Sequence, residues 1–232
     1  MNYSNIISET SIERKGSSME IQLRLEEKSD YRVVEELTRD AFWNHHVPGC
    51  DEHYLAHILR TSPAFVKELD FVALVNDQIV GNIMYSKAFI QGDDGKRYPV
   101  LSFGPISVLN NMQGMGIGSS LIQHTMKLAA KLGYQAIVIY GDPEYYHRFG
   151  FTGAENFNIG TAWDTYATPL LACELIPGAL QNCPGKFYED DIYHLDETAS
   201  ALFDQNFPPK EKCSGLPSQK RFSELVAMNR PR

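Results

Sequence analysis

The chain has 232 residues, of which 43% are hydrophobic and 22% are charged, and its formal net charge is -8. This length and composition are typical of one globular domain with a full hydrophobic core. Nucleic-acid-binding proteins usually carry a basic face, and no basic run is present, so we predict that nucleic acid is not a partner. No stretch approaches 18 uninterrupted apolar residues, and residues 1–18 lack an apolar signal core. We therefore predict no membrane span and a cytoplasmic location.

The four cysteines and two of the histidines bear on metal binding. No two cysteines have the Cys-x-x-Cys spacing of zinc and redox motifs. His53 and His57 lie four residues apart, a spacing that metal ligands use on a helix. However, His53 is followed by Tyr54 instead of glutamate, and no third ligand is placed nearby. We therefore predict that the protein binds no metal.

The N-terminal part of the chain predicts a leader, a strand and two helices. Residues 1–18 lack hydrophobic periodicity, so we expect a disordered leader, with Met19 as an alternative start. Residues 21–25 alternate between apolar and polar, which indicates a half-buried strand. Apolar residues then recur with helical spacing through Val33–Phe42. A second helix is expected to begin after Asp51 and to run through Leu59.

The middle of the chain predicts a sheet crossed by a helix. Apolar runs separated by turns at 71–75, 79–89 and 98–108 predict an antiparallel meander of three strands. The amphipathic stretch 116–132 predicts a helix, and the apolar run 136–140 predicts a strand buried on both faces. Because that helix is a crossover, the strands on either side of it should be parallel.

The C-terminal part of the chain carries weaker patterns. Pro143 suits the first turn of a short helix that ends at Phe149. A further strand is expected over 170–176, and a helix is expected from Asp196 through Phe203. Residues 189–191, Glu-Asp-Asp, read as an acidic surface run, and the polar tail to Arg232 is expected to be partly disordered.

The sequence from Gln113 to Ser119 joins the strand at 98–108 to the helix at 116–132. Glycines let a backbone approach a ligand closely, and a helix N-terminus presents N–H groups and a positive dipole end, so such a junction is an anion site. A phosphate-binding P-loop would need Gly-Lys-Ser/Thr, but Gly118 is followed by Ser119-Ser120. The dinucleotide fingerprint also fails, because its third glycine is missing.

A third pattern fits these residues. Gln113-x-x-Gly116-x-Gly118, after a strand that ends in residues 104–108 (Gly-Pro-Ile-Ser-Val), resembles the acyl-CoA loop of the GNAT N-acetyltransferases. Residues 145–151, Tyr-Tyr-His-Arg-Phe-Gly-Phe, resemble that family's second motif, and the two motifs occur in the right order. The resemblance covers about residues 20–180.

The resemblance implies an α/β (α+β) fold with a mixed central sheet. That sheet is largely antiparallel, contains a parallel splayed pair, and is flanked by helices. We expect residues 19–180 to form the acyl-CoA-binding domain. Residues 181–232 would be an extension, either packed on that domain or partly disordered.

The cosubstrate implied by the resemblance is acetyl-CoA. The loop amides and the helix dipole suit its pyrophosphate. Pro105 cannot donate to a strand ladder, so Gly104-Pro105 indicates a bulge that splays two strands, and the resemblance places the pantetheine arm in that split. One N–H there would act as an oxyanion donor. The residues assigned to cofactor binding are Ile106, Ser107, Val108, Gln113, Gly114, Met115, Gly116, Ile117, Gly118 and Ser119.

Acetyl transfer to an amine also needs an acid and a base. The resemblance places the general acid four residues before Gly150, at Tyr146, and the pKa values of a tyrosine and a thiol are roughly matched. No residue is assigned as the base: His147, Glu144 and Glu52 are candidates by type, and a water chain is an alternative. Possible acceptor contacts are Trp43, His45, His46 and Tyr54.

These patterns lead to one functional prediction with two alternatives. We predict an N-acetyltransferase that transfers an acetyl group from acetyl-CoA to a primary amine by direct attack. The acceptor, a small molecule or a peptide, and the oligomeric state are not specified by the sequence. A non-catalytic acyl-CoA-binding or sensing module is the second reading, and a nucleotide-binding protein of another class is the third.

Overall fold

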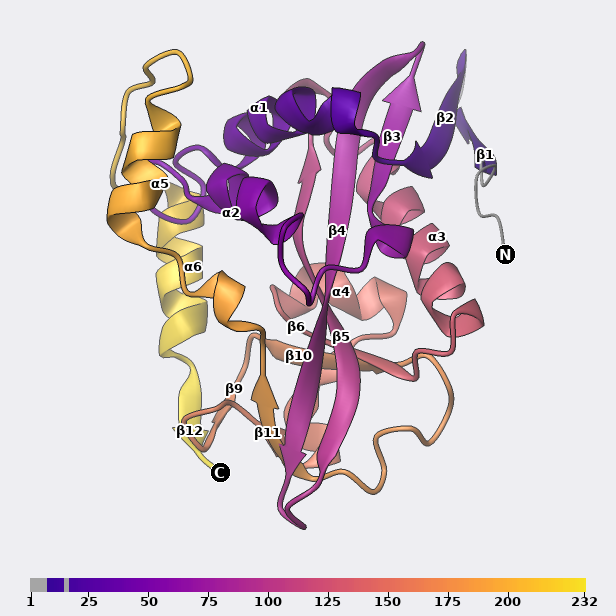
Figure 1. Ribbon diagram of the computed structural model, residues 1–232, viewed down its shortest axis with the longest axis vertical. Coiled ribbons are helices and arrows are strands. Elements are labelled where there is room, and N and C mark those ends of the chain that lie inside the picture. The colour runs from indigo at the N-terminus through magenta and orange to yellow at the C-terminus, as the bar shows by residue number, and fades with distance from the viewer. Residues whose placement is uncertain (1–7, 15–16) are drawn as a thin grey trace.

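The computed structural model describes residues 8–14 and 17–232 (Figure 1). Within these residues, ten strands form one mixed sheet, in the order β1-β2-β3-β4-β5-β6-β10-β7. Off this path, β11 (Gly185–Tyr188) pairs with β4, and β8 (Ile159–Gly160) pairs with β11. The strands of the main path are Ser8–Arg14 (β1), Ser17–Leu25 (β2), Phe71–Val75 (β3), Gln78–Gly92 (β4), Arg97–Val108 (β5), Ala136–Tyr140 (β6), Thr152–Gly153 (β7) and Leu170–Glu174 (β10). Neighbours on this path are antiparallel except β5 and β6, which are parallel. The predicted meander and the predicted parallel pair are thus confirmed.

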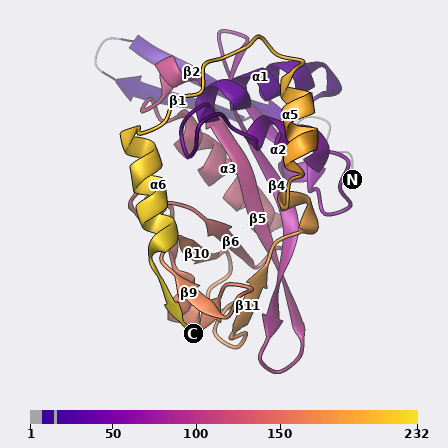
Figure 2. The ribbon, with the colours of Figure 1, turned by 90° about the vertical axis from the view of Figure 1, so that its left-hand side faces the viewer.

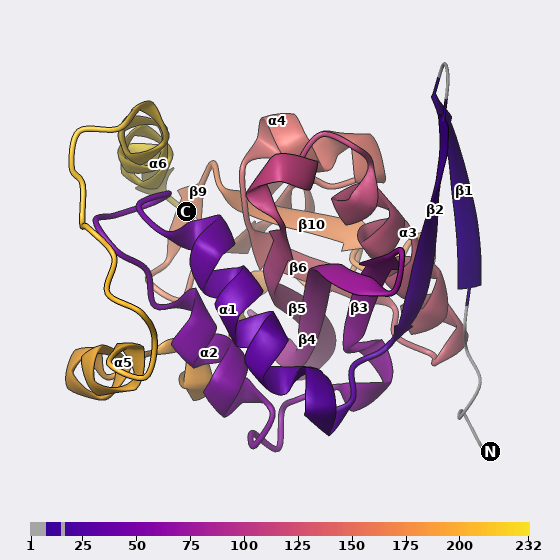
Figure 3. The ribbon, with the colours of Figure 1, turned by 90° about the horizontal axis from the view of Figure 1, so that it is seen from above.

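Helices cover both faces of the sheet. Helix α3 (Ile117–Lys131) packs on one face, and α1 (Tyr31–Phe42) and α2 (Glu52–Leu59) pack on the other (Figure 3). The alternation along β4 shows why: the Tyr85 hydroxyl bonds Thr125 of α3, whereas Met84 packs with Leu55 and Leu59 of α2. Because successive side chains of a strand point to opposite faces, a strand covered on both sides has to be apolar throughout.

The main hydrophobic core lies between α3 and the sheet. The apolar stripe expected on this helix is present, since Ile117, Leu121, Ile122 and Ala129 are all buried there. They meet Ile83 and other side chains from the central strands. This packing fixes the position of the first turn of α3 relative to β5.

Strands β5 and β6 separate at one end. Tyr85 of β4 pairs with Phe103, but Ile83 pairs with Ile106, so β5 carries an extra residue at Gly104-Pro105. On its other edge, β5 has a single pair with β6 in the described part of the chain, Leu101 with Ile137. Beyond that pair the strands diverge. The bulge and the split expected from Gly104-Pro105 are therefore present.

The N-terminal segment differs from the expected leader. Residues 8–14 and 17–18 form antiparallel strand pairs, Ser8 with Leu23 through Arg14 with Ser17. The edge of β2 offers unpaired N–H and C=O groups, and pairing to such an edge requires no hydrophobic periodicity. Residues 1–7 and 15–16 of the expected leader lie outside the described residues.

The C-terminal segment is more regular than expected. Strand β11 (Gly185–Tyr188) pairs with β4, and β12 (Asn229–Pro231) pairs with β9 (Thr165–Ala167). Helices α5 (Glu197–Asp204) and α6 (Pro217–Ala227) flank α1 and α2 (Figure 2). These elements correspond to the packed arrangement, one of the two expected for residues 181–232. Polar contacts hold α6, because the Arg221 guanidinium donates to both carboxylate oxygens of Asp142 at 3.0 and 3.1 Å.

Candidate functional site

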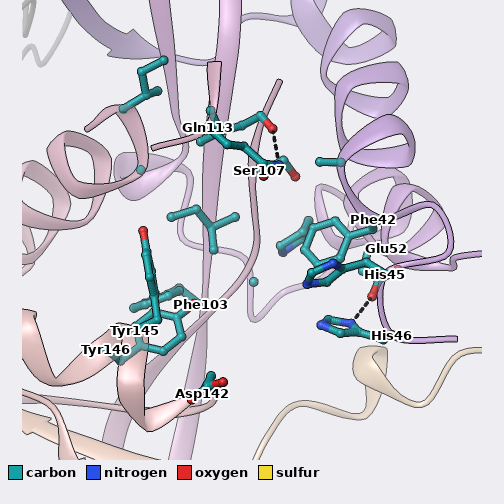
Figure 4. A pocket seen from close by; sticks show the side chains of 18 of the residues that line it. Phe42, His45, His46, Glu52, Phe103, Ser107, Gln113, Asp142, Tyr145 and Tyr146 are labelled. Carbon is teal, nitrogen blue, oxygen red and sulfur yellow. Dashed lines mark hydrogen bonds and ion pairs between the residues drawn. The ribbon is translucent and has the colours of Figure 1, made fainter. Parts of the chain in front are cut away.

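A cavity of about 940 Å³ opens where β5 and β6 diverge (Figure 4). Five parts of the chain line it: α1 with α2, the bulged end of β5, the glycine loop with the start of α3, the segment after β6, and the C-terminal extension. The sheet, a helix N-terminus and side chains from three other segments therefore meet in one space.

The glycine loop has a backbone conformation that favours glycine. Gly114 and Gly116 have φ values of +74° and +87°, in the left-handed region where side chains are disfavoured. The Gln113 side-chain amide donates to the Val108 carbonyl at 3.2 Å and so ties the loop to the end of β5. The first amide bonded within the turn is that of Ser120, which donates to Gly116. The preceding amides of α3 are positioned for an anion.

Most of the residues predicted to bind a cofactor meet at this cavity. Those that line it are Ile106, Ser107, Val108, Gln113, Gly114, Gly116, Ile117, Gly118 and Ser119. Met115 is the exception: it does not line the cavity, and it is 37% exposed. It stands between two left-handed glycines, so the loop turns its side chain toward solvent.

The β5 backbone presents donors to the split at two positions. The Leu109 amide donates to Val80 of β4 at 2.9 Å. Because N–H groups alternate between the edges of a strand, those of Ile106 and Val108 point to the opposite edge, toward β6. By the same alternation, the Ser107 N–H points to β4. The Ser107 hydroxyl donates to Thr38 of α1 at 3.2 Å, so Ser107 braces the wall of the split.

Two tyrosines of helix α4 (Pro143–Tyr146) enter the cavity at right angles to each other, with an interplanar angle of 87°. Tyr146 packs against Phe103 of β5, with ring centroids 5.9 Å apart, and burial raises the pKa of its phenol. The Tyr145 hydroxyl reaches the first turn of α3 instead, where a Cβ added to Gly118 would lie 3.0 Å from it. Tyr145, which the sequence analysis assigned no role, also lines the cavity (Figure 4).

The comparison with known families agrees with this geometry. Residues 67–153 match the model of the acetyltransferase (GNAT) domain. This segment of the chain is therefore similar to the acetyltransferase domain of the GNAT family.

Relatives and solved structures extend the comparison. The uncharacterized N-acetyltransferase YhbS of Escherichia coli K12 is 27% identical over 108 residues, which are 47% of this chain and 63% of YhbS. The uncharacterized N-acetyltransferase YjhQ of the same strain is 31% identical over 84 residues, 36% of this chain and 45% of YjhQ. The matched segments thus span less than two thirds of these curated relatives.

Two solved GNAT structures share the fold. The crystal structure of E. coli YhbS in complex with CoA has a TM-score of 0.69 and 23% identity, and it covers 79% of this chain and 97% of its own. A GNAT acetyltransferase from Brucella melitensis in complex with acetyl-CoA has a TM-score of 0.59 and 26% identity. The match covers 75% of this chain and 97% of the Brucella chain. The expected mixed sheet with its parallel pair is confirmed as the GNAT fold.

The wall of the cavity opposite the glycine loop comes from α1 and α2. Phe42, His45, His46 and Glu52 line it, and His46 Nδ1 lies 3.2 Å from a Glu52 carboxylate oxygen. Burial lowers the pKa of His45. Two of the four predicted acceptor contacts, His45 and His46, are therefore at the cavity.

The other two predicted acceptor contacts lie elsewhere. The Trp43 indole N–H donates to the carbonyl of Glu211, and the Tyr54 ring packs on Phe203 of α5. Neither lines the cavity, because both side chains contact the C-terminal extension instead. Among the base candidates named by type, Glu52 lines the cavity, whereas Glu144 and His147 do not.

The C-terminal extension supplies two cavity residues that the sequence analysis missed. Glu189 follows β11, and its carboxylate accepts from the Ser102 hydroxyl at 3.4 Å. The Tyr193 hydroxyl donates to the Gly104 carbonyl at 3.3 Å. Burial raises the pKa of Glu189 to about 7. The interpretation of Glu189 as part of an acidic surface run is wrong, because β11 pairs with β4 and carries the following residue over the sheet.

The two histidines at metal-ligand spacing are engaged with protein groups. His53 is buried against Phe207, and His57 Nδ1 lies 2.9 Å from Glu35. Among the residues placed by the structure, no group of three or more His, Cys, Asp or Glu side chains could hold a metal ion. No helix in that part of the chain has the length and apolar character needed to cross a bilayer.

Proposed function

We propose that this protein transfers an acetyl group from acetyl-CoA to a primary amine. The observation that carries the proposal is the joining, in one cavity, of a glycine-built helix N-terminus, a split between parallel strands and a half-buried tyrosine. The crystal structures of E. coli YhbS with CoA and of the Brucella GNAT protein with acetyl-CoA support the choice of cosubstrate.

In this proposal the pyrophosphate of acetyl-CoA lies at the start of α3. Backbone N–H groups between Gln113 and Ser119, together with the positive end of the helix dipole, neutralise its charge without a lysine. The pantetheine arm extends into the split between β5 and β6. There the amide of Ile106 or Val108 donates to the thioester oxygen as negative charge develops on it.

Tyr146 is proposed as the general acid that protonates the departing CoA thiolate. It lines the cavity beside Phe103 at the start of the split. Because burial raises the pKa of Tyr146, the phenol keeps its proton throughout the physiological range. The pKa of Tyr146 therefore lies further above that of a thiol than the sequence analysis expected. The contribution of Tyr146 begins as a hydrogen bond to sulfur, which strengthens as negative charge accumulates there and ends in transfer of the proton.

The cytoplasmic location is also a proposal. Four cysteines carry free thiols, and Cys50, Cys173 and Cys183 are buried. Unpaired buried thiols are typical of proteins that fold in a reducing compartment.

The division of the chain at residue 180 is a proposal as well. The extension from 181 to 232 adds β11 to the sheet and Glu189 to the cavity. We propose that it completes the acceptor side of the acetyl-CoA-binding domain at 19–180.

The test of the function is the release of free thiol from acetyl-CoA against a panel of amines, with Tyr146→Phe as the variant. This change removes one oxygen and little packing, so acetyl-CoA binding should persist while kcat falls by about 10²-fold or more. Tyr145→Phe is the contrast, because its hydroxyl lies at the start of α3 and its loss should act mainly on acetyl-CoA affinity.

Three results separate the alternatives. Acetyl-CoA binding with no thiol release from any amine favours the non-catalytic module. A thermal shift with ATP or NAD and none with CoA indicates a nucleotide-binding protein of another class. Parental turnover by Tyr146→Phe, with a chemical step known to limit the rate, removes the acid role from Tyr146.

A further inference from the structure

Glu189 and Tyr193 reach the cavity from outside the segment that matches the GNAT domain, residues 67–153. Both side chains form hydrogen bonds with neighbouring residues of β4 and β5, close to the bulge in β5. The Tyr193 hydroxyl bonds Ser86 at 3.0 Å and the Gly104 carbonyl at 3.3 Å, while Glu189 accepts from Ser102. Ser86 and Ser102 are directly paired across β4 and β5. The carboxylate is thus held beside the strand that forms one wall of the split.

The acid and this carboxylate approach β5 from opposite faces. Tyr146 packs on Phe103, whose side chain lies on the α3 face with Tyr85. Glu189 contacts Ser102, the neighbouring residue, whose side chain points to the other face. The α3 face is where the glycine loop would hold the cofactor. The Glu189 face opens instead toward α1 and α2, so it is the side from which an acceptor can reach a thioester in the split.

Three carboxylates line the cavity in the described chain, and their partners differ. Asp142 is held by Arg221 through both oxygens, and this pairing lowers its pKa. Glu52 has one oxygen 3.2 Å from His46 and the other accepting from the Asp51 amide at 3.1 Å. An arginine-bound carboxylate is a poor proton acceptor. The hydrogen bond seen for Glu189 is a long one, from a neutral serine.

We propose that Glu189 is the general base that takes the proton of the acceptor ammonium group. This assignment rests on the proposed acetyltransferase function and supplies the base that the sequence did not identify.

The surroundings of Glu189 suit a group that exchanges a proton near neutral pH. Burial raises its pKa to about 7, against smaller lowering effects of Ser102 and His194. The phenols of Tyr140 on β6 and Tyr193 also face it, and burial raises the pKa of both. The nearby Asp190 is engaged, since it accepts from the Ile192 amide at 3.2 Å and from Ser62 at 3.3 Å. An alkylamine with a pKa near 10 is mostly charged at pH 7 and needs such an acceptor.

The proposed step balances as follows. An N–H bond of the ammonium breaks, and its proton forms an O–H bond on Glu189. The freed nitrogen lone pair attacks the thioester carbon, and the C=O π electrons move onto oxygen. On collapse the C–S bond breaks with its electron pair on sulfur, which receives the Tyr146 proton. The nitrogen then loses its second proton, which returns through solvent to the Tyr146 oxygen. The proton on Glu189 passes to water, so the net products are the amide, the CoA thiol and one proton.

The test compares Glu189→Gln with Glu197→Gln, a matched change at an exposed position on α5. Two probe acceptors are used with each protein: an alkylamine that is charged at pH 7, and hydroxylamine, which is neutral there. With the alkylamine, Glu189→Gln should lower kcat/KM by about 10²-fold at pH 7. With hydroxylamine the loss should be several-fold at most, and acetyl-CoA affinity, measured by calorimetry, should match the parent.

A pH profile and a direct titration give readouts that a structural role would not move. In the parent, kcat/KM for the alkylamine should rise through a group that titrates near pH 7, and Glu189→Gln should lose that limb. NMR of ¹³C-labelled glutamate carboxyls should show one resonance that titrates near pH 7 and is absent in Glu189→Gln. An equal loss of kcat/KM with both probe amines, or titration of Glu189 at the ordinary glutamate pKa, would overturn the assignment of Glu189 as the general base.

The outcomes also distinguish the base from the function on which it rests. If Glu189→Gln has the activity and the pH profile of the parent, Glu189 is not the base, and the proposed acetyltransferase function is unaffected. Failure of the parent to release thiol with any probe amine overturns the proposed function, and the base with it.

Discussion

Replacing Glu189 by glutamine should make the protein more stable at neutral and alkaline pH, although it removes a group proposed to act in turnover. Burial raises the pKa of the folded-state carboxyl to about 7 from an ordinary value of 4.5. Between these two values the unfolded chain releases a proton that the folded protein keeps. The unfolded state then binds fewer protons, so stability falls as pH rises through this window.

The size of the effect follows from the pKa difference. One pKa unit corresponds to about 1.4 kcal/mol, so the shift corresponds to at most about 3 kcal/mol between acidic and alkaline conditions. This stability is fully present below pH 4.5 and is lost once the pH passes 7. Glutamine cannot ionise, so the variant should not show this loss. Its advantage over the parent should therefore grow from pH 4.5 to 7 and then stay constant.

The assay is urea unfolding of the parent and Glu189→Gln at a series of pH values from 4.5 to 8.5, without acetyl-CoA. The difference in unfolding free energy between the two proteins should change by about 2–3 kcal/mol over this range. Glu197→Gln should follow the parent, because its carboxyl is exposed. A difference that stays flat with pH would refute the reasoning, since it would mean that the carboxyl ionises as readily in the folded protein as in the unfolded chain.

Two further substitutions test the loop and the core. Gly116→Val should abolish acetyl-CoA binding, measured by calorimetry, and Gly95→Val is its matched control because the two glycines have similar φ values, +87° and +84°. Both changes should lower stability by about 1–2 kcal/mol, and binding lost equally in both would contradict the assignment of the loop. Thr125→Val removes the 2.9 Å hydrogen bond to the buried Tyr85 hydroxyl and should cost about 1–3 kcal/mol in urea unfolding. Unchanged stability would show that this hydroxyl finds another partner.

The elements that could be predicted from sequence are those with strong local patterns. The meander from β3 to β5, helix α3 and strand β6 each carry a clear periodicity or a continuous apolar run, and each was found as expected. Helix α6 was missed because its position depends on polar contacts with distant residues. Its Gln219 side chain donates to the carbonyls of Asn44 and Cys213, and only Gln219 and Leu225 of the helix are buried.

The same distinction applies to the cavity. The glycine loop and the bulge were predictable because backbone conformation at Gly114, Gly116 and Pro105 depends on the residue itself. Glu189 was not predictable, since its partner Ser102 lies 87 residues earlier in the chain. Nothing local to an acidic triplet indicates that its first member will be covered by the sheet.

The distance along the chain between the glycine loop and Glu189 has a consequence for the nascent protein. Ribosomes add about 5–20 residues per second, so roughly 4–14 seconds separate the synthesis of the loop from that of Glu189. During that interval the sheet from β3 to β6 can assemble with the loop in place. We therefore expect a growing chain to acquire its affinity for acetyl-CoA before it contains the residue proposed to deprotonate an acceptor. The cofactor could then bind and stabilise a chain that does not yet catalyse transfer.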